Sequence, residues 1–187
     1  KNADWLFDML IDDYQVKDCL QPYNLGLREE LDRLRFRGKI VKDGEYKVSA
    51  LHMAVYFSRE VAVGEPYKYS YINKLLESGA SASIMSQSPS LFSPIDLAID
   101  INDPHALSIL LSHASSRDVF ISSESYLRGA AKKKSAEMIQ LLMDKLKKVD
   151  GYEKQLNFWI CINIVVYDVD EFHFLLNHAH FSEDQLN

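Results

Sequence analysis

A six-residue motif occurs twice in this chain of 187 residues, each time ahead of a pair of leucines. Ser49–Ala54 reads SALHMA and is followed by Leu75–Leu76, while Ser93–Ala98 reads SPIDLA and is followed by Leu110–Leu111. A hydroxyl residue ahead of apolar residues at helical spacing is typical of the start of an amphipathic helix. A pair of such short helices cannot bury both of its faces alone, so the units must stack on one another.

The motif keeps a nearly regular spacing further along the chain. Ser49 and Ser93 are 44 residues apart, the next matching start is Ser125, 32 residues on, and a further 33 residues lead to Phe158. Two successive steps of this size are hard to obtain by chance and indicate a structural repeat. In the family the glycine of Gly-Ala falls about 21 residues after the first hydroxyl residue, but here Gly79 lies about nine residues further on than that. This displacement indicates an insertion of about nine residues near 63–71, whose glycine and proline predict a loop.

The second copy contains two predicted helix starts. Ser93 is followed by Pro94, and Asp103 is followed by Pro104. Serine and aspartate cap helix N-termini, and proline is tolerated in the first helical turn because its missing N–H has no partner there. This unit is therefore predicted to consist of two helices, the second beginning near Asp103.

These features resemble the ankyrin repeat, whose signature is Thr-Pro-Leu-His-x-Ala followed by Leu-Leu-x-x-Gly-Ala over about 33 residues. The resemblance implies an all-α solenoid of helix-turn-helix units joined by short β-hairpin-like loops. In the family, the signature histidine and the adjacent hydroxyl residue tie neighbouring repeats together by hydrogen bonds. His52 is the only histidine at that position in this chain. The residues that carry the signature are Ser49, His52, Ala54, Gly79, Ser93, Pro94, Ala98 and Ala130.

The same register divides the chain into an N-terminal capping region and a series of repeats. We expect a helical cap over 1–26 and ankyrin-like repeats over 27–187, made of a partial repeat at 27–48 and further repeats at 49–92, 93–124, 125–157 and 158–187. The chain begins at Lys1 without a methionine, and Phe181–Asp184 has the pattern of a new helix start. We therefore expect it to be part of a longer protein.

The resemblance also implies a partner-binding surface. Ankyrin-like proteins bind partners through the hairpin tips and the exposed side of the inner helices. The equivalent positions here are Glu45, Tyr46, Val48, Tyr56 and Phe57 in the first repeat, Ser90, Phe92, Asp100 and Ile101 in the second, Ile121, Glu124, Lys132 and Lys133 in the third, and Lys154, Gln155, Asn157, Val165 and Val166 in the fourth. This surface would need a partner protein and no cofactor.

Aromatic residues gather on this implied surface and on the inserted loop. The surface carries Tyr46, Tyr56, Phe57 and Phe92, and the loop carries Tyr67, Tyr69 and Tyr71. Aromatic side chains dominate interface hot spots, so the first group is a candidate partner site. An alternative stays open for each group. The first inner helix and its inserted loop could cover the rings of the first group, and the loop tyrosines could simply pack the loop back onto the helices.

The sequence offers few candidates for catalysis. Its seven glycines are scattered, whereas a phosphate-binding loop needs them clustered. Asp168 and Asp170 follow an apolar run, a pattern that resembles the metal-binding edge of nucleotide-sugar glycosyltransferases, but the repeat register places both acids at a helix N-terminus, where acids cap. We expect no catalytic residue.

Metal ligation and cysteine chemistry are equally weak. His173, His178 and His180 lie close in sequence, but a metal site needs further ligands in fixed geometry. Cys19 and Cys161 match neither a disulfide framework nor a zinc spacing, and Cys161 is expected to be buried. We therefore predict no metal site and no cofactor.

Charge and hydropathy limit the classes of partner. The chain has 21 basic and 27 acidic residues and a formal net charge of -6, which does not indicate nucleic-acid binding. It contains no run of about 18 uncharged apolar residues, so we expect no membrane insertion. Lys132–Lys134 either docks an acidic segment or is a solvated face.

The expected function is that of a non-catalytic protein–protein interaction module that binds a partner on the concave face of the stack. We expect a monomer in the cytoplasm, or in the host-cell cytoplasm if the protein is a secreted effector. The alternative is the substrate-recognition domain of a larger enzyme, or of a host-directed bacterial or viral effector, whose catalytic part lies outside this sequence.

Overall fold

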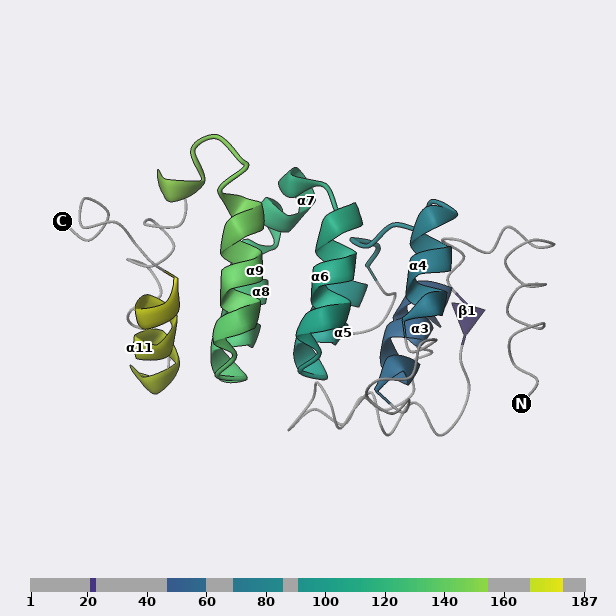
Figure 1. The fold of residues 1–187 in the computed structure, drawn as a ribbon, viewed down its shortest axis with the longest axis horizontal. Coiled ribbons are helices and arrows are strands. Elements are labelled where there is room, and N and C mark those ends of the chain that lie inside the picture. The colour runs from purple at the N-terminus through teal and green to yellow at the C-terminus, as the bar shows by residue number, and fades with distance from the viewer. Residues whose placement is uncertain (1–20, 23–46, 60–68, 86–90, 155–168, 180–187) are drawn as a thin grey trace.

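The described part of the chain is almost entirely helical. The computed structural model describes residues 21–22, 47–59, 69–85, 91–154 and 169–179 (Figure 1). Its strands are the two-residue segments β1 (Gln21–Pro22) and β2 (Lys47–Val48), which pair antiparallel with Gln21 opposite Val48. The chain therefore belongs to the all-α class in this part. The predicted capping region over 1–26 lies outside the described residues except for 21–22.

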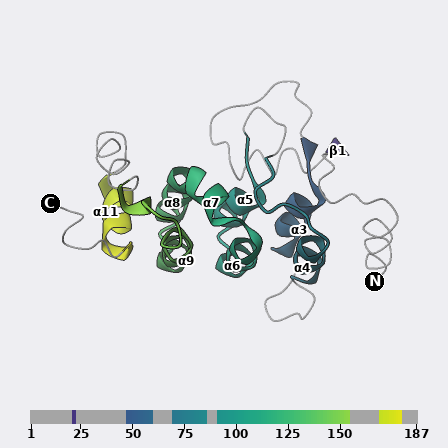
Figure 2. The ribbon, with the colours of Figure 1, turned by 90° about the horizontal axis from the view of Figure 1, so that it is seen from above.

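The helices form hairpins that stand side by side in two rows. The inner row contains α3 (Ala50–Ser58), α5 (Pro94–Asp100) and α8 (Ser123–Lys132), and the outer row contains α4 (Ser70–Glu77), α6 (Pro104–His113) and α9 (Ala136–Leu146). Each inner helix packs on the outer helix that follows it and on the next inner helix, and each outer helix packs on the next outer helix. The view from above separates the two rows (Figure 2).

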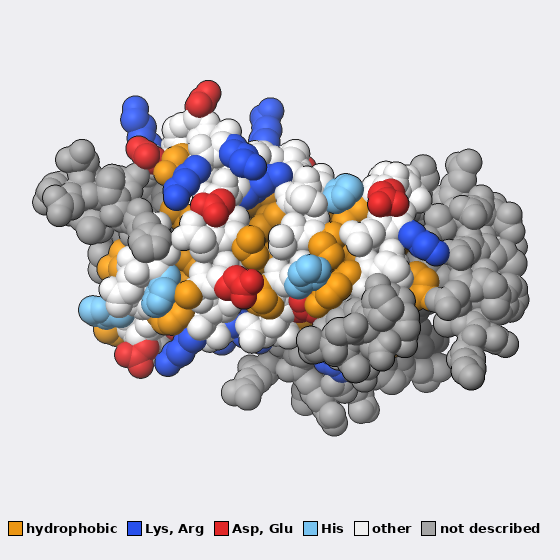
Figure 3. Space-filling model, viewed as in Figure 1, with side chains coloured by type: hydrophobic (Ala, Val, Ile, Leu, Met, Phe, Trp, Pro, Cys, Tyr) orange, Lys and Arg blue, Asp and Glu red, His pale blue; other side chains and the backbone are white. Residues whose placement is uncertain are grey.

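The last described helix, α11 (Val169–His178), packs against both α8 and α9 at one end of the row (Figure 1). Figure 3 shows the face that carries the outer helices. Hydrophobic side chains lie there between the helices, among charged side chains of both signs, rather than in one broad patch. None of the described helices is long and apolar enough to cross a bilayer.

Equivalent positions of the three hairpins build one continuous core. Leu51, Ile95 and Leu127 of the inner row are completely buried. The alanines Ala54, Ala98 and Ala130 follow three residues later on the same helices and are also buried. Small residues let neighbouring helices approach closely, so the alanines set the spacing of the inner row while the larger residues fill the core.

The helices begin where the sequence predicts caps. Ser93 caps α5 with Pro94 in the first turn, and its hydroxyl accepts a bond from the Asp96 backbone N–H (3.2 Å). Asp103 caps α6 by accepting from the Ala106 N–H (2.9 Å). Each cap satisfies a backbone donor that the helix itself leaves without a partner.

In the second and third hairpins, very tight turns join the inner helix to the outer helix. Asn102 after α5 and Lys134 after α8 adopt left-handed φ values of 58° and 52°. In the second hairpin the Asp103 N–H donates to the Ala98 carbonyl and the Asn102 N–H to the Ile99 carbonyl, the pattern of a Schellman motif. Asp103 is also the N-cap of α6, so the same residue ends the turn after α5 and begins the next helix.

One predicted connection is wrong. The segment between the second and third hairpins was expected to be a β-hairpin-like loop, but it contains a helix, α7 (Ser116–Ile121), capped by the Ser115 hydroxyl. The reason is local: the cap begins a helical turn, and Val119 is fully buried where α7 packs against α9. The third inner helix accordingly begins at Ser123, ahead of the expected start at Ser125.

The C-terminal end of the expected insertion is helical. Helix α4 begins at Ser70, so Ser70 and Tyr71 are helical although both fall within the expected insertion at 63–71. Residues 60–68 lie outside the described part. Gly79 ends α4 with φ 91°, and its neighbour Ala80 donates to the Leu75 carbonyl, as a helix-ending glycine does.

A buried histidine links the first hairpin to the second. The Ser49 N–H donates to His52 Nδ1 (3.1 Å), so Nδ1 carries no proton. The proton is therefore on Nε2, which lies 3.1 Å from the carbonyl oxygen of Phe92 and donates to it. The His52 ring also meets the Phe92 ring edge to face, with centroids 5.2 Å apart. One side chain thus completes the cap of α3 and holds the next hairpin.

We predict that His52→Ala lowers the free energy of unfolding by about 3 kcal/mol, because it removes the hydrogen bonds of His52 to the buried Phe92 carbonyl and to the Ser49 N–H. His52→Asn is the matched control: its amide oxygen replaces Nδ1 in the cap but does not reach Phe92. It should cost about half as much. Urea unfolding followed by circular dichroism measures both. A loss below 1 kcal/mol for His52→Ala, or equal losses for the two variants, would contradict the assignment.

A second prediction concerns Gly129, where α8 lies closest to α5. A Cβ at this position would lie 2.9 Å from Cγ2 of Ile99, which is almost completely buried and stiff because it is β-branched. Gly129→Ala should therefore destabilise the protein by about 1–3 kcal/mol, although alanine is the better helix former.

Ile99→Leu moves the branch away from Cβ and should relieve this contact. We expect the double variant to be more stable than the sum of the two single effects predicts, by about 1 kcal/mol or more. Thermal unfolding of the four proteins gives the coupling. A stabilising effect of Gly129→Ala alone would disprove the close approach.

Candidate functional site

A depression of about 280 Å³ opens between the N-terminal ends of α5 and α8. We call it the α5–α8 groove. Its lining residues come from the segment before α5, from α5, from the end of α7 and from the N-terminal half of α8. They are Met85, Leu91, Asp96, Ile121, Ser122, Glu124, Ser125 and Arg128. It is the candidate functional site because it combines exposed apolar residues with a fixed polar floor.

The rim of the α5–α8 groove is apolar and exposed. Leu91 is 61% exposed, Met85 is 40% exposed and Ile121 is 70% exposed. Three of the five large hydrophobic residues that are exposed in the described part of the chain therefore border one depression. Scattered single apolar residues are normal on protein surfaces, but their concentration around a concavity makes this depression a candidate interaction site.

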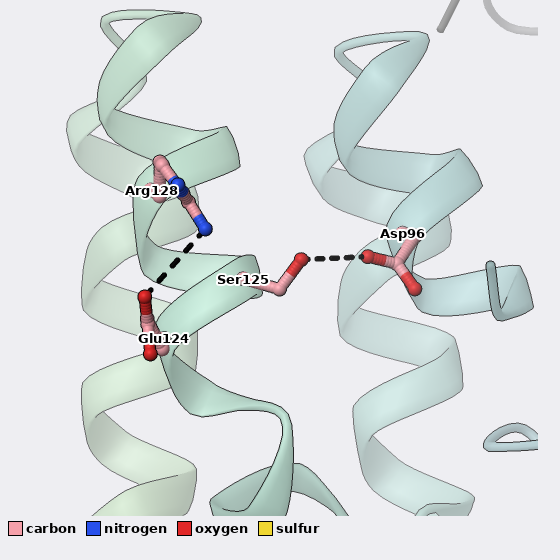
Figure 4. A network of polar contacts seen from close by, with 4 residues as sticks. All are labelled: Asp96, Glu124, Ser125 and Arg128. Atoms are coloured by element: carbon pink, nitrogen blue, oxygen red, sulfur yellow. Dashed lines mark hydrogen bonds and ion pairs between the residues drawn. The ribbon is translucent and has the colours of Figure 1, made fainter. Parts of the chain in front are cut away.

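The floor is held by the carboxylate of Asp96. Its Oδ2 accepts from the Ser93 N–H and from the Ser93 hydroxyl, both at 2.8 Å, and its Oδ1 accepts from the Ser125 hydroxyl at 3.3 Å (Figure 4). The side chain is 9% exposed. Since a buried carboxylate is stable only with such donors, Asp96 is a fixed negative charge beneath the groove.

The side of the groove formed by α8 carries a charged pair. Arg128 and Glu124 lie one helical turn apart, with Nη2 and Oε1 separated by 3.6 Å, and each side chain is 47% exposed (Figure 4). Exposed pairs at this spacing contribute only about 0.3–0.5 kcal/mol. The pair is therefore easily rearranged when another charged group enters the groove.

Tyr126 lies behind the floor and ties α8 to α5. Its hydroxyl is 3.0 Å from Ser93 Oγ, and it donates this bond because the Ser93 hydroxyl proton already goes to Asp96. Burial, and then the negative charge of Asp96, raise the pKa of the Tyr126 hydroxyl. Tyr126 is 2% exposed, so it supports the groove without being accessible from it.

The predicted aromatic row does not exist as an exposed surface. Tyr56 is 5% exposed and Phe92 is 2% exposed, so both expectations were wrong. Phe92 is buried because it packs edge to face on His52. Tyr56 meets the Phe57 ring and the Arg59 guanidinium, which donates to its hydroxyl (2.7 Å). Of this row only Phe57, at 48%, is exposed, and Tyr46 lies outside the described residues.

Tyr69 connects the outer helices, which favours the structural interpretation of this loop residue. Its hydroxyl donates to the carboxylate of Asp103, 3.1 Å from each oxygen, and its ring lies against His105 at a centroid distance of 4.4 Å. Burial, and then the charge and hydrogen bond of Asp103, raise the pKa of Tyr69 to about 12. Tyr67 lies outside the described residues.

Four of the other predicted partner residues lie away from the α5–α8 groove. Asp100 ends α5 and Ile101 follows it, partly buried against the core. Lys132 ends α8 and is exposed, and Lys133 follows it and is half-buried. All four lie at the C-terminal ends of helices whose N-terminal ends form the groove. Val48 lies in β2.

Sequence reasoning found part of the groove and missed the rest. Ile121 and Glu124 were expected on the partner surface, and both line the groove. Met85, Leu91 and Arg128 were not predicted. The pair Leu91–Phe92 was the available signal, because only one of these two neighbours can enter the core. The sequence analysis placed Phe92 on the surface, whereas Leu91 is the exposed residue.

The other candidates for chemistry have structural contacts. Asp170 lies in the first turn of α11, where an acid stabilises the helix N-terminus, while Asp168 lies outside the described residues. His178 is stacked on Phe174, and its Nδ1 lies 2.8 Å from the carbonyl oxygen of that residue. Within the part of the chain that the structure describes, no three His, Cys, Asp or Glu side chains gather as a metal site requires.

A scan of the chain against protein-family models, a search of curated proteins and a search of solved structures each found no match. The function of the α5–α8 groove therefore has to be inferred from its own residues. These comprise an exposed apolar rim, a buried carboxylate held by three donors and a weak surface ion pair.

We predict that the Tyr69–Asp103 bond stabilises the fold below pH 10 and fails in stronger base. Because folding raises the pKa of Tyr69 from 10.0 to about 12, the protonated hydroxyl contributes stability that is lost as the pH rises through this range. Tyr69→Phe should cost about 1 kcal/mol at neutral pH, and its deficit should shrink above pH 10. Urea unfolding at several pH values measures this difference.

Asp103→Asn is the matched control, because asparagine caps a helix as well as aspartate but carries no charge. It should move the tyrosinate absorbance transition of Tyr69 towards pH 10, the ordinary value. If Tyr69→Phe lowers the free energy of unfolding by the same amount at all pH values, ionisation of the Tyr69 hydroxyl does not weaken the fold as predicted.

Proposed function

We propose that this chain is a stack of ankyrin-like repeats that acts as a non-catalytic protein-interaction module, with the α5–α8 groove on its partner-binding face. The observation that carries the proposal is the concentration of exposed apolar side chains around the groove, with Ile121 70% exposed. Association removes such surface from water, which is the main favourable term in most protein–protein binding.

The ankyrin-like assignment is supported by repeated local chemistry. Ser49 with His52, and Ser93 with Asp96, form the same reciprocal capping box at the start of successive inner helices. In the family that the sequence resembles, the signature histidine ties one repeat to the next. The bond from His52 Nε2 to the carbonyl of Phe92, the residue directly before the Ser93 cap of α5, supports the same role here.

The second repeat and the connection that follows it depart from the pattern. A helix, α7, replaces the loop between the second and third repeats, and Asp96 replaces the signature histidine in the second. Asp96 still reaches the following repeat, through Ser125. The stack can therefore keep its register while its connecting segments diverge, and these segments are where binding specificity usually lies.

We predict that Ile121→Asp abolishes partner binding without unfolding the protein. Aspartate places a charge on the apolar rim, whereas exposed substitutions change stability by only about 0.5 kcal/mol. Val169→Asp is the matched control, because Val169 is 68% exposed on α11, which packs on the far side of α8 from α5. Affinity capture with the wild type and both variants, quantified side by side, tests the site.

Proteins retained by the wild type and by Val169→Asp but lost by Ile121→Asp would support the proposal. Equal retention by Ile121→Asp would show that the groove is not the binding site. Thermal unfolding of each variant provides the folding control.

A further inference from the structure

Met85, on the rim of the α5–α8 groove, differs from the other described methionines in its exposure. Its side chain is 40% exposed, whereas those of Met53, Met138 and Met143 are 8%, 0% and 2% exposed. Met9 lies outside the described residues. An oxidant in water reaches a thioether sulfur readily only where the side chain is open to solvent. Within the described part of the chain, Met85 is therefore the methionine that should react first.

Met85 lies outside the helices, in the segment that connects the first hairpin to the second. The residues before it form a turn, in which the Ile84 N–H donates to the Ser81 carbonyl at 3.3 Å. Met85 is not a member of the buried core on which the packing of the helices depends. A change in the polarity of this side chain therefore alters the surface of the groove and leaves the stack folded.

Oxidation makes this part of the rim polar. The sulfur attacks one oxygen of hydrogen peroxide, and the S–O bond forms as the O–O bond breaks. The sulfur is oxidised by two electrons, and the second oxygen leaves as water with both protons. The product, methionine sulfoxide, carries a polar oxygen in place of a flexible apolar thioether.

The neighbours of Met85 on the rim make this change matter for binding. Leu91 and Ile121 are exposed and apolar, so a partner that covers the three residues together removes them from water. After oxidation the same partner has to bury the sulfoxide oxygen next to apolar side chains. A polar group buried without a hydrogen bond weakens binding.

We propose that Met85 is an oxidation site that controls binding at the α5–α8 groove, through conversion of its thioether to the sulfoxide by peroxide. The inference rests on the proposed function and adds its regulation. The modification is reversible: methionine sulfoxide reductases return the sulfoxide to the thioether, while two thiols are oxidised to a disulfide and the oxygen leaves as water.

The first experiment locates the oxidation. The whole chain is treated with increasing amounts of hydrogen peroxide, and each methionine is followed by peptide mapping with mass spectrometry. Met85 should gain one oxygen atom at a peroxide concentration that leaves Met138 and Met143 unmodified, and circular dichroism should show that the oxidised protein is folded. Oxidation of Met138 or Met143 ahead of Met85 overturns the inference.

The second experiment measures binding of a peptide selected from a displayed random library on the wild-type chain, with counter-selection on Ile121→Asp. Peroxide is removed before the peptide is added. Oxidation should weaken binding about tenfold or more, as expected for one unpaired polar group in an interface. The two methionine sulfoxide reductases, one for each sulfoxide epimer, should restore the affinity. Dithiothreitol alone should not, which separates the sulfoxide from reversibly oxidised cysteine.

Met85→Leu is the matched control, because leucine is apolar and has no sulfur. Each protein is compared with itself before and after peroxide, so any effect of the substitution alone cancels. Met85→Leu should keep its affinity after peroxide. An equal loss in Met85→Leu, or an unchanged affinity of the wild type once Met85 is fully oxidised, overturns the inference and leaves the proposed function in place. An absence of any Ile121-dependent peptide overturns both.

Discussion

The row of hairpins depends on hydrogen bonds that leave the first turn of one inner helix and end on the next hairpin. His52 reaches the carbonyl of Phe92, and Asp96 receives the hydroxyl of Ser125. Helices as short as α5 are not stable alone in water, so their order comes from these contacts and from the core between them. Because each of these two side chains also completes a capping box through another of its atoms, the start of a helix and its register against the next hairpin are set together.

The parts that depend on local chemistry were predictable from the sequence. Ser93 and Asp103 cap their helices because a side-chain oxygen next to a helix start satisfies backbone donors without any help from tertiary structure. The spacing of buried positions such as Leu51 and Ile95 followed from helical periodicity. Gly79 ends α4 because glycine adopts a left-handed conformation without strain.

The parts that depend on a neighbour were not predictable. Whether Tyr56 or Phe57 enters the core is decided by the direction in which α3 faces, and whether Phe92 or Leu91 does so is decided by the position of His52. No sequence pattern carries this information, because both members of each pair are large and hydrophobic. The α5–α8 groove was unpredictable for a similar reason. Its residues come from α5, α7, α8 and the segment before α5, which only the stacking of the hairpins brings together.

Helix α7 explains why the groove lies between the second and third hairpins rather than beside the insertion in the first. It has only one fully buried residue, Val119, with Phe120 partly buried beside it, so it adds little to the core. Its contribution is to the groove, because its last residue, Ile121, lines the depression together with Leu91. A weakly packed element can change its rim residues at little cost in stability, whereas the floor below it cannot, because Asp96 also holds two hairpins together. Under the proposed function, affinity and specificity are therefore expected to vary through α7 while the Asp96 carboxylate beneath it stays in place.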